Sequence, residues 1–187
     1  LASNLYRAKD FMPEGLANRM KKLSEGTDPL YLSFDHDPAK GGKGFLESAN
    51  YKTLVPGNFR RSSTGTDAWT KMWSAGYGIG SGSTEQANKC YARYKLTGIE
   101  GYRILFMKSV DAYYHEEPPP SAVLYPSNYS SIFNMMMNAY ELTGEARFLS
   151  KAKMYMELSV EALLDDQSPL PKASNQSEHY EAITGGP

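Results

Sequence analysis

The residues with the clearest potential for chemistry stand near the end of the chain. His179, Tyr180 and Glu181 are consecutive, and Asn175 lies shortly before them. Imidazole, phenol and carboxyl groups can all act as general acids or bases. They follow a long polar stretch at 165–177, and long loops on a helical scaffold often carry function. We therefore predict a proton-transfer site at the start of a further helix, with a surface histidine as the alternative interpretation of His179.

A second group of residues could bind a flat ligand. Trp69 and Trp73, the only tryptophans in the chain, are spaced to share one face of a helix that Asp67 can cap. The glycine-rich segment 76–82 follows and contains Tyr77. It lacks the strand and the Lys-Ser/Thr pair of a phosphate-binding loop, which excludes nucleotide binding. Aromatic rings beside exposed backbone suit a sugar ring, although both tryptophans could instead belong to a core.

Charged residues earlier in the chain offer two further possibilities. Arg60 and Arg61 could hold a carboxylated ligand through paired hydrogen bonds, or could simply lie on the surface. Asp35, His36 and Asp37 have the side-chain types of a divalent-metal site. Adjacent side chains of an extended chain point to opposite faces, so one of the three would miss the ion. We therefore expect a solvated loop there, and no metal or other cofactor.

Two helical hairpins are predicted to position these groups, at 84–114 and 128–164. Tyr-Lys-Leu-Thr-Gly at 94–98 matches Tyr-Glu-Leu-Thr-Gly at 140–144, 46 residues later. Each motif ends an amphipathic helix at a glycine, the residue that a left-handed helix cap favours. An aromatic residue follows each glycine by four positions. A period of about 40–50 residues is typical of arrays of helical hairpins, although the motif could also be no more than a good way to end a helix.

The remaining sequence favours an all-α protein with a single domain over 1–187. A short helix is predicted at 16–23, a break at 24–29 and an extended segment at 30–34. Neither end supplies a convincing capping repeat with a polar outer face, so we expect part of a longer array.

Composition limits the partners. The net charge of −1 gives no reason to expect nucleic acid, and no apolar run has the length of a membrane span. The single cysteine, Cys90, excludes an internal disulfide. The sequence leaves the oligomeric state open.

Over 67–184 this arrangement of hairpins, Tyr-x-Leu-Thr-Gly breaks and polar loops resembles the α/α-toroid carbohydrate-active enzymes. Those are polysaccharide lyases and glycoside hydrolases built from helical hairpins in a ring. The resemblance implies a substrate groove at one end of the ring, lined by loops and by aromatic platforms. The expected partner is therefore a polysaccharide or oligosaccharide. The sequence leaves the location open, with the periplasm or secretion favoured.

Two chemistries compete within that resemblance. In a lyase, His179 or Tyr180 would remove the proton next to a uronate carboxylate, and Arg60 or Arg61 would neutralise the acid. This is the activity we favour. A hydrolase would need two carboxylates across the scissile bond, for which the candidates are Glu181, Asp165, Asp166, Asp35 and Asp37. A third possibility is a scaffold or sugar-binding protein without catalysis.

Overall fold

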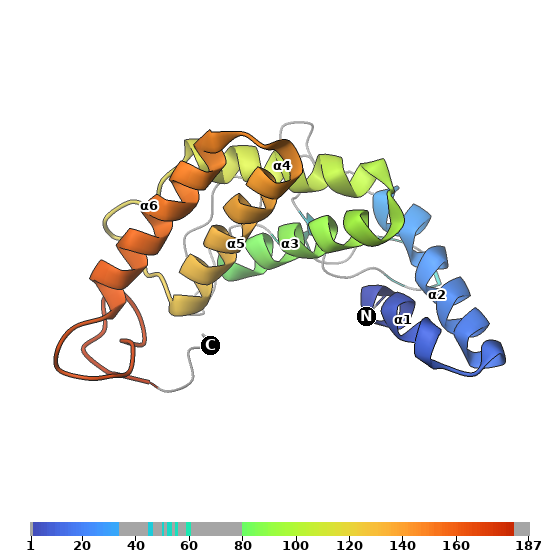
Figure 1. Ribbon diagram of the computed structural model, residues 1–187, viewed down its shortest axis with the longest axis horizontal. Helices are drawn as coiled ribbons and strands as arrows, with labels where there is room; N and C mark the ends of the chain where they lie inside the picture. The colour runs from blue at the N-terminus through green and yellow to red at the C-terminus, as the bar shows by residue number, and fades with distance from the viewer. Residues whose placement is uncertain are drawn as a thin grey trace.

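The protein is mostly helical in the computed structural model, which describes residues 2–33, 45–46, 50, 52–53, 55, 59–60 and 80–181. The expected all-α class is confirmed. The helices shown in Figure 1 are α1 (Ala2–Ala8), the 3₁₀ turn η1 (Lys9–Phe11), α2 (Glu14–Leu32), α3 (Gly80–Thr97), α4 (Glu100–His115), α5 (Pro126–Thr143) and α6 (Ala146–Leu163). Two-residue strands β1 (Phe45–Leu46) and β2 (Phe59–Arg60) pair antiparallel.

Helices α3–α4 and α5–α6 form two hairpins whose breaks have the same geometry. Gly98 and Gly144 take left-handed conformations, with φ of 71° and 73°. The hydroxyls of Thr97 and Thr143 each donate to the carbonyl four residues earlier, at 2.8 Å in both cases. Each hydroxyl also accepts a bond from the amide two residues later, at 3.3 and 3.2 Å. The repeated sequence motif therefore builds the same turn twice, because every contact in it is local.

The second hairpin lies beside the first, with α5 packed along α3 and α6 along α5 (Figure 1). The amide of Asn88 on α3 donates to the Ser131 carbonyl at 3.0 Å and accepts from the Asn138 amide at 2.9 Å. Closer to Gly98 and Gly144, where α3 and α5 end, Lys95 Nζ lies 2.9 Å from Glu141 Oε1. These contacts set the register of α5 along α3, since each joins defined positions on the two helices.

The core runs through both hairpins and is dominated by large side chains. Tyr113, Tyr155, Phe106 and Phe148 are each at most 1% exposed. Burying one such side chain contributes roughly 1.5–3 kcal/mol relative to leaving it in water. Burial of these aromatic and aliphatic faces therefore holds α4 and α6 against the inner helices α3 and α5.

Helix α2 departs from the sequence expectation. It continues from Glu14 to Leu32, so the predicted break at 24–29 and the predicted extended segment from residue 30 are wrong. Asp28 is 3% exposed and accepts bonds from Arg93 Nε at 2.9 Å, from Arg93 Nη2 at 2.7 Å and from Tyr102 Oη at 2.7 Å. These contacts with the first hairpin require a helix that carries Asp28 inward, and they override the weak helical preference around Gly26 and Pro29.

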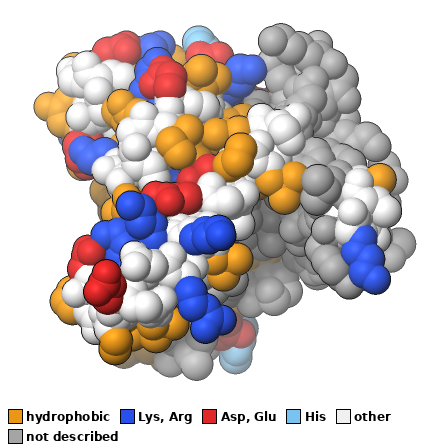
Figure 2. All heavy atoms as spheres, turned by 90° about the vertical axis from the view of Figure 1, so that its right-hand side faces the viewer, with side chains coloured by type: hydrophobic (Ala, Val, Ile, Leu, Met, Phe, Trp, Pro, Cys, Tyr) orange, Lys and Arg blue, Asp and Glu red, His pale blue; other side chains and the backbone are white. Residues whose placement is uncertain are grey.

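The outward side of α2 carries a hollow of about 640 Å³ that Leu16, Arg19, Met20 and Leu23 help to line. Figure 2 views the molecule from this end and shows basic, acidic and hydrophobic side chains close together. The charged residues that line the hollow, Arg19 and Lys22, are both basic, and acidic side chains lie nearby on the same face. No helix in the described ranges is long and apolar enough to cross a membrane.

Candidate functional site

The polar loop after α6, residues 164–181, is fastened to the connection between α4 and α5. Asn175 makes the central contacts. Its Oδ1 accepts from the Leu124 amide at 2.9 Å, and its Nδ2 donates to the Ala122 carbonyl at 3.0 Å. Its backbone amide donates to the Leu124 carbonyl at 3.0 Å. Both functions of this side-chain amide are occupied, so Asn175 holds the loop in place.

The last described part of the loop is a short β-ladder. Tyr180 pairs with Lys172 in an antiparallel bridge, and the Ala173 amide donates to the His179 carbonyl at 2.8 Å. The predicted helix start at 179–181 is therefore wrong, because these residues are not helical and Tyr180 forms an isolated β-bridge instead. Successive side chains of such a segment point to opposite sides. His179 and Glu181 share one side, and Tyr180 points to the other.

On its side of the ladder, Tyr180 joins three charged residues that we call the Tyr180 cluster: Tyr180, Asp165, Lys172 and Glu178. Tyr180 Oη donates to Asp165 Oδ2 at 2.7 Å and lies 3.0 Å from Oδ1. Lys172 Nζ lies 3.4 Å from Asp165 Oδ2 and 3.4 Å from Glu178 Oε2. One ammonium group therefore lies between two carboxylates, and the phenol donates to one of them.

These contacts set the protonation states within the cluster. The hydrogen bond from Tyr180 lowers the pKa of Asp165, assisted by the Gln167 backbone amide and by Lys172. The same hydrogen bond raises the pKa of Tyr180, with a smaller contribution from desolvation. At neutral pH the carboxylate is therefore ionised and the phenol keeps its proton. Tyr180 therefore holds a proton and Asp165 offers an unprotonated oxygen, although both shifts carry the pKa values further from neutrality and so weaken the phenol as an acid and the carboxylate as a base.

The other side of the ladder is open. His179 Nε2 lies 3.7 Å from Glu181 Oε1, and their side chains are 74% and 45% exposed. The three residues that the sequence predicts as one catalytic group thus divide into an exposed His179–Glu181 pair and a tyrosine on the opposite side.

Most of the other predicted site residues lie outside the described residues: Arg61, Trp69, Trp73 and Tyr77 of the sugar-binding prediction, and Asp35, His36 and Asp37 of the metal alternative. Arg60 ends strand β2. In the part of the chain that the structure describes, no three His, Cys, Asp or Glu residues gather as metal ligands.

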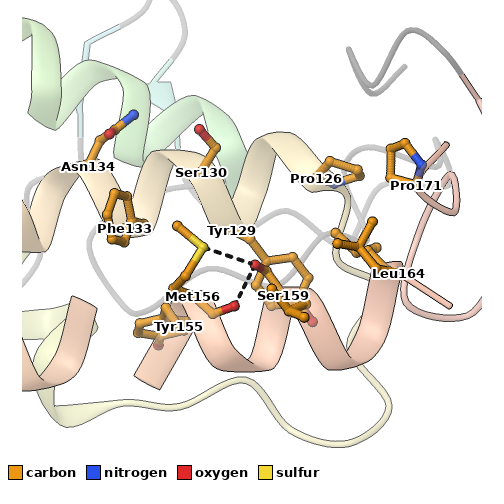
Figure 3. A pocket seen from close by; sticks show the side chains of 12 residues that line it. Pro126, Tyr129, Ser130, Phe133, Asn134, Tyr155, Met156, Ser159, Leu164 and Pro171 are labelled. Atoms are coloured by element: carbon orange, nitrogen blue, oxygen red, sulfur yellow. Dashed lines mark hydrogen bonds between the residues drawn. The ribbon is translucent and has the colours of Figure 1, made fainter. Parts of the chain in front are cut away.

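A groove of about 400 Å³ between α5 and α6 was not predicted from the sequence. Its lining includes Ser130, Phe133 and Asn134 of α5 and Met156 and Ser159 of α6. Figure 3 shows Phe133, Met156 and Ser159 between the two helices, and Ser130 and Asn134 on the side of α5 that points away from α6. Pro171 of the C-terminal loop lines one end, so the groove adjoins the segment that carries Lys172. The sequence signal that could have revealed it is the repeat itself, because Phe133 stands where the first hairpin has the smaller Ala87.

Comparisons with protein families, with curated proteins and with solved structures find no match for this chain.

Proposed function

We propose that this protein is a carbohydrate-active enzyme of the α/α-toroid kind that cleaves a uronate-containing polysaccharide by β-elimination. In this proposal the hairpins α3–α4 and α5–α6 are neighbouring units of the ring. The loop 164–181 and the α4–α5 connection both follow the second helix of a hairpin, and Asn175 joins them. They therefore lie at the same end of the array, which is the substrate end in the proposal.

The observation that carries the proposal is the Tyr180 cluster. A β-elimination needs a cation or hydrogen-bond donors to neutralise the uronate carboxylate, a proton acceptor, and a proton donor for the departing oxygen. Lys172 supplies the cation. Its contact with Glu178 is weak, because the Glu178 side chain is 91% exposed and 3.4 Å away. A uronate carboxylate would take the place of Glu178 beside the ammonium group.

The proton transfers of the reaction involve only Asp165 and Tyr180, so no other acid or base is needed. Asp165 accepts the proton from the carbon next to the uronate carboxylate, a carbon–carbon double bond forms, and the bond to the glycosidic oxygen breaks. Tyr180 gives its phenolic proton to that departing oxygen. The proton on Asp165 returns to the Tyr180 oxygen along their 2.7 Å hydrogen bond, which restores the starting state.

The same geometry favours elimination over hydrolysis. A hydrolase requires a carboxylic acid that keeps its proton and a second carboxylate across the bond. The pKa of Asp165 is lowered, so this residue is not the acid, and the proton donor that contacts it is a phenol.

The test is the ultraviolet absorbance of an unsaturated uronate while the full chain is incubated with polygalacturonate, alginate and glucuronate-containing glycans. Tyr180→Phe and Lys172→Met should each lower the rate by a factor of about 10²–10⁴. Lys153→Met is the matched control, because Lys153 lies on α6 with its side chain 77% exposed. A third variant, His179→Ala, decides which side of the ladder faces the substrate, and we expect it to keep activity.

The outcomes separate the alternatives. New reducing ends without the absorbance rise would replace the proposal with hydrolysis. Binding of a glycan with neither product would replace it with a sugar-binding scaffold. An absorbance rise that survives both Tyr180→Phe and Lys172→Met would place the active site elsewhere.

A further inference from the structure

The groove between α5 and α6 has a covered counterpart in the same molecule. Asn134 in the groove stands 46 residues after Asn88, whose side chain lies in the seam between α3 and α5. Asn88 donates to the Ser131 carbonyl and accepts from the Asn138 amide, so both functions of its amide are used. The Asn134 side chain is exposed, and no hydrogen bond joins it to another described residue. The second hairpin thus repeats the amide of the seam, but none of the described helices lies across from it.

The apolar positions show the same difference. Ala87 of α3 and Val110 of α4 are both 0% exposed. Their counterparts 46 residues later are Phe133 and Met156, which line the groove. Phe133 is only partly buried, and Met156 is 43% exposed. Surface that is covered in the first hairpin is therefore open in the second, and it is more apolar at position 133 than at position 87.

We propose that this groove is a docking site for an amphipathic α-helical hairpin built like α5–α6. The first helix of the partner lies along α5 as α5 lies along α3. The seam between α3 and α5 specifies the polar chemistry that the partner must carry. The first helix of the partner presents a backbone carbonyl to Asn134 Nδ2 and, two helical turns later, an amide side chain to Asn134 Oδ1. Ser131 and Asn138 do the same for Asn88.

A helical hairpin fits the groove better than a sugar does. Apart from Asn134, the residues facing it are mainly aromatic and aliphatic, and two of the polar side chains have little to offer a ligand. Ser159 already donates its hydroxyl to the Met156 carbonyl at 2.8 Å, and Tyr155 is fully buried beneath the surface. Apolar ridges beside one paired amide are the features of a helix–helix seam. The inference does not use the carbohydrate activity, so a chain without lyase activity would leave it standing.

The test compares the full chain with a lengthened chain in which residues 118–163 occur a second time directly after Leu163. The added hairpin can then occupy the groove in the order in which α5–α6 follows α3–α4. We expect one cooperative unfolding transition at a higher temperature than in the parent, because repeat arrays gain stability from each neighbour interface.

Substitutions identify the groove as the docking surface. Phe133→Glu and Asn134→Leu in the first copy should lower the midpoint of the lengthened chain by clearly more than that of the parent, in which Phe133 is only partly buried against the core. Lys153→Glu is the control on the outward side of α6, and it should act equally in both chains. Equal effects of Phe133→Glu and Asn134→Leu in both chains would overturn the inference. The inference would also be overturned if the backbone amides of the added hairpin exchange freely with solvent while those of the original helices stay protected.

A second measurement tests the docking site without relying on the lengthened chain to fold. A fluorescent peptide of residues 126–163 is titrated with the parent chain and followed by anisotropy. We expect saturable binding that Phe133→Glu weakens at least tenfold and Lys153→Glu leaves unchanged. Absence of binding, or binding that Phe133→Glu does not affect, would refute the docking site.

Discussion

The phenol of Tyr180 donates a 2.7 Å hydrogen bond to the carboxylate of Asp165, the second residue after helix α6. This bond closes a loop of the chain and brings an ionised carboxylate to a protonated phenol beside Lys172. Everything proposed for the chemistry depends on this contact, and it also links the stability of the loop to pH.

We expect the protein to lose stability at low pH, because Asp165 is then protonated. The folded pKa of Asp165 is below the unfolded value of about 3.9, so its contribution is complete above the unfolded pKa and is lost as pH falls through the folded pKa. Thermal unfolding midpoints of the wild type and of Asp165→Asn should therefore differ most near neutral pH and converge at low pH. A difference that grows below pH 4 would contradict the assigned hydrogen bond.

The Asn175 contacts should control how firmly the C-terminal loop is held. Asn175→Ala removes two hydrogen bonds to the α4–α5 connection and should raise proteolytic cleavage within 164–181 by about tenfold, since a hydrogen bond contributes roughly 0.5–1.5 kcal/mol. Helical content, measured by circular dichroism, should not change. Gln176→Ala is the matched control, because Gln176 makes longer bonds of 3.2 Å from an exposed side chain. Equal cleavage of the two variants would show that Asn175 has no special role.

Breaking the buried ion pair between α2 and the first hairpin should be costly. The side chains of Asp28 and Arg93 are only 5% and 4% exposed. Removing one partner leaves the other charge buried, so Arg93→Met should lower the free energy of unfolding by about 3–5 kcal/mol in urea denaturation. Asp28→Leu combined with Arg93→Met should be more stable than Arg93→Met alone. If the double variant is the less stable of the two, the cost does not come from an unpaired charge.

The two hairpin breaks should respond alike to alanine. Gly98→Ala and Gly144→Ala put a β-carbon on a left-handed backbone, which costs about 1–2 kcal/mol each. The control is Gly26→Ala inside α2, where a β-carbon meets nothing within 4 Å and the change should stabilise by about 0.5–1 kcal/mol. Urea titrations measure all three. Stabilisation by Gly98→Ala or Gly144→Ala would rule out the left-handed conformation.

Cys90 should be unreactive until the protein unfolds. It is 4% exposed, and burial raises the pKa of its thiol to about 12, against a smaller opposing effect of a hydrogen bond involving Tyr31. Because the thiolate is the reactive form, an aromatic disulfide reagent at pH 8 should modify the folded chain hardly at all and the urea-unfolded chain completely. Rapid modification of the folded chain would mean that α3 opens readily.

The sequence alone was sufficient to predict the helices of both hairpins and the break at each glycine. Residues 80–115 and 126–163 are helical around Gly98 and Gly144. Apolar periodicity and the threonine–glycine cap act within a few residues, so the information is present in the local sequence. The aromatic platform at Trp69, Trp73 and Tyr77 lies outside the described residues and stays a prediction.

The features that depend on contacts between different segments could not be predicted from the sequence. Local preference indicated a break near Pro29, but Arg93, 65 residues from Asp28, holds that segment inward as a helix. Adjacency suggested one catalytic group at His179 and Tyr180, but pairing with Lys172 sends their side chains to opposite sides. The groove at Asn134 exists because a helix covers Asn88 and none of the described helices covers its repeat. The first two outcomes depend on contacts between segments, Asp28 with Arg93 and Lys172 with Tyr180, and the third depends on where the next described helix packs. Short-range sequence patterns do not encode any of them.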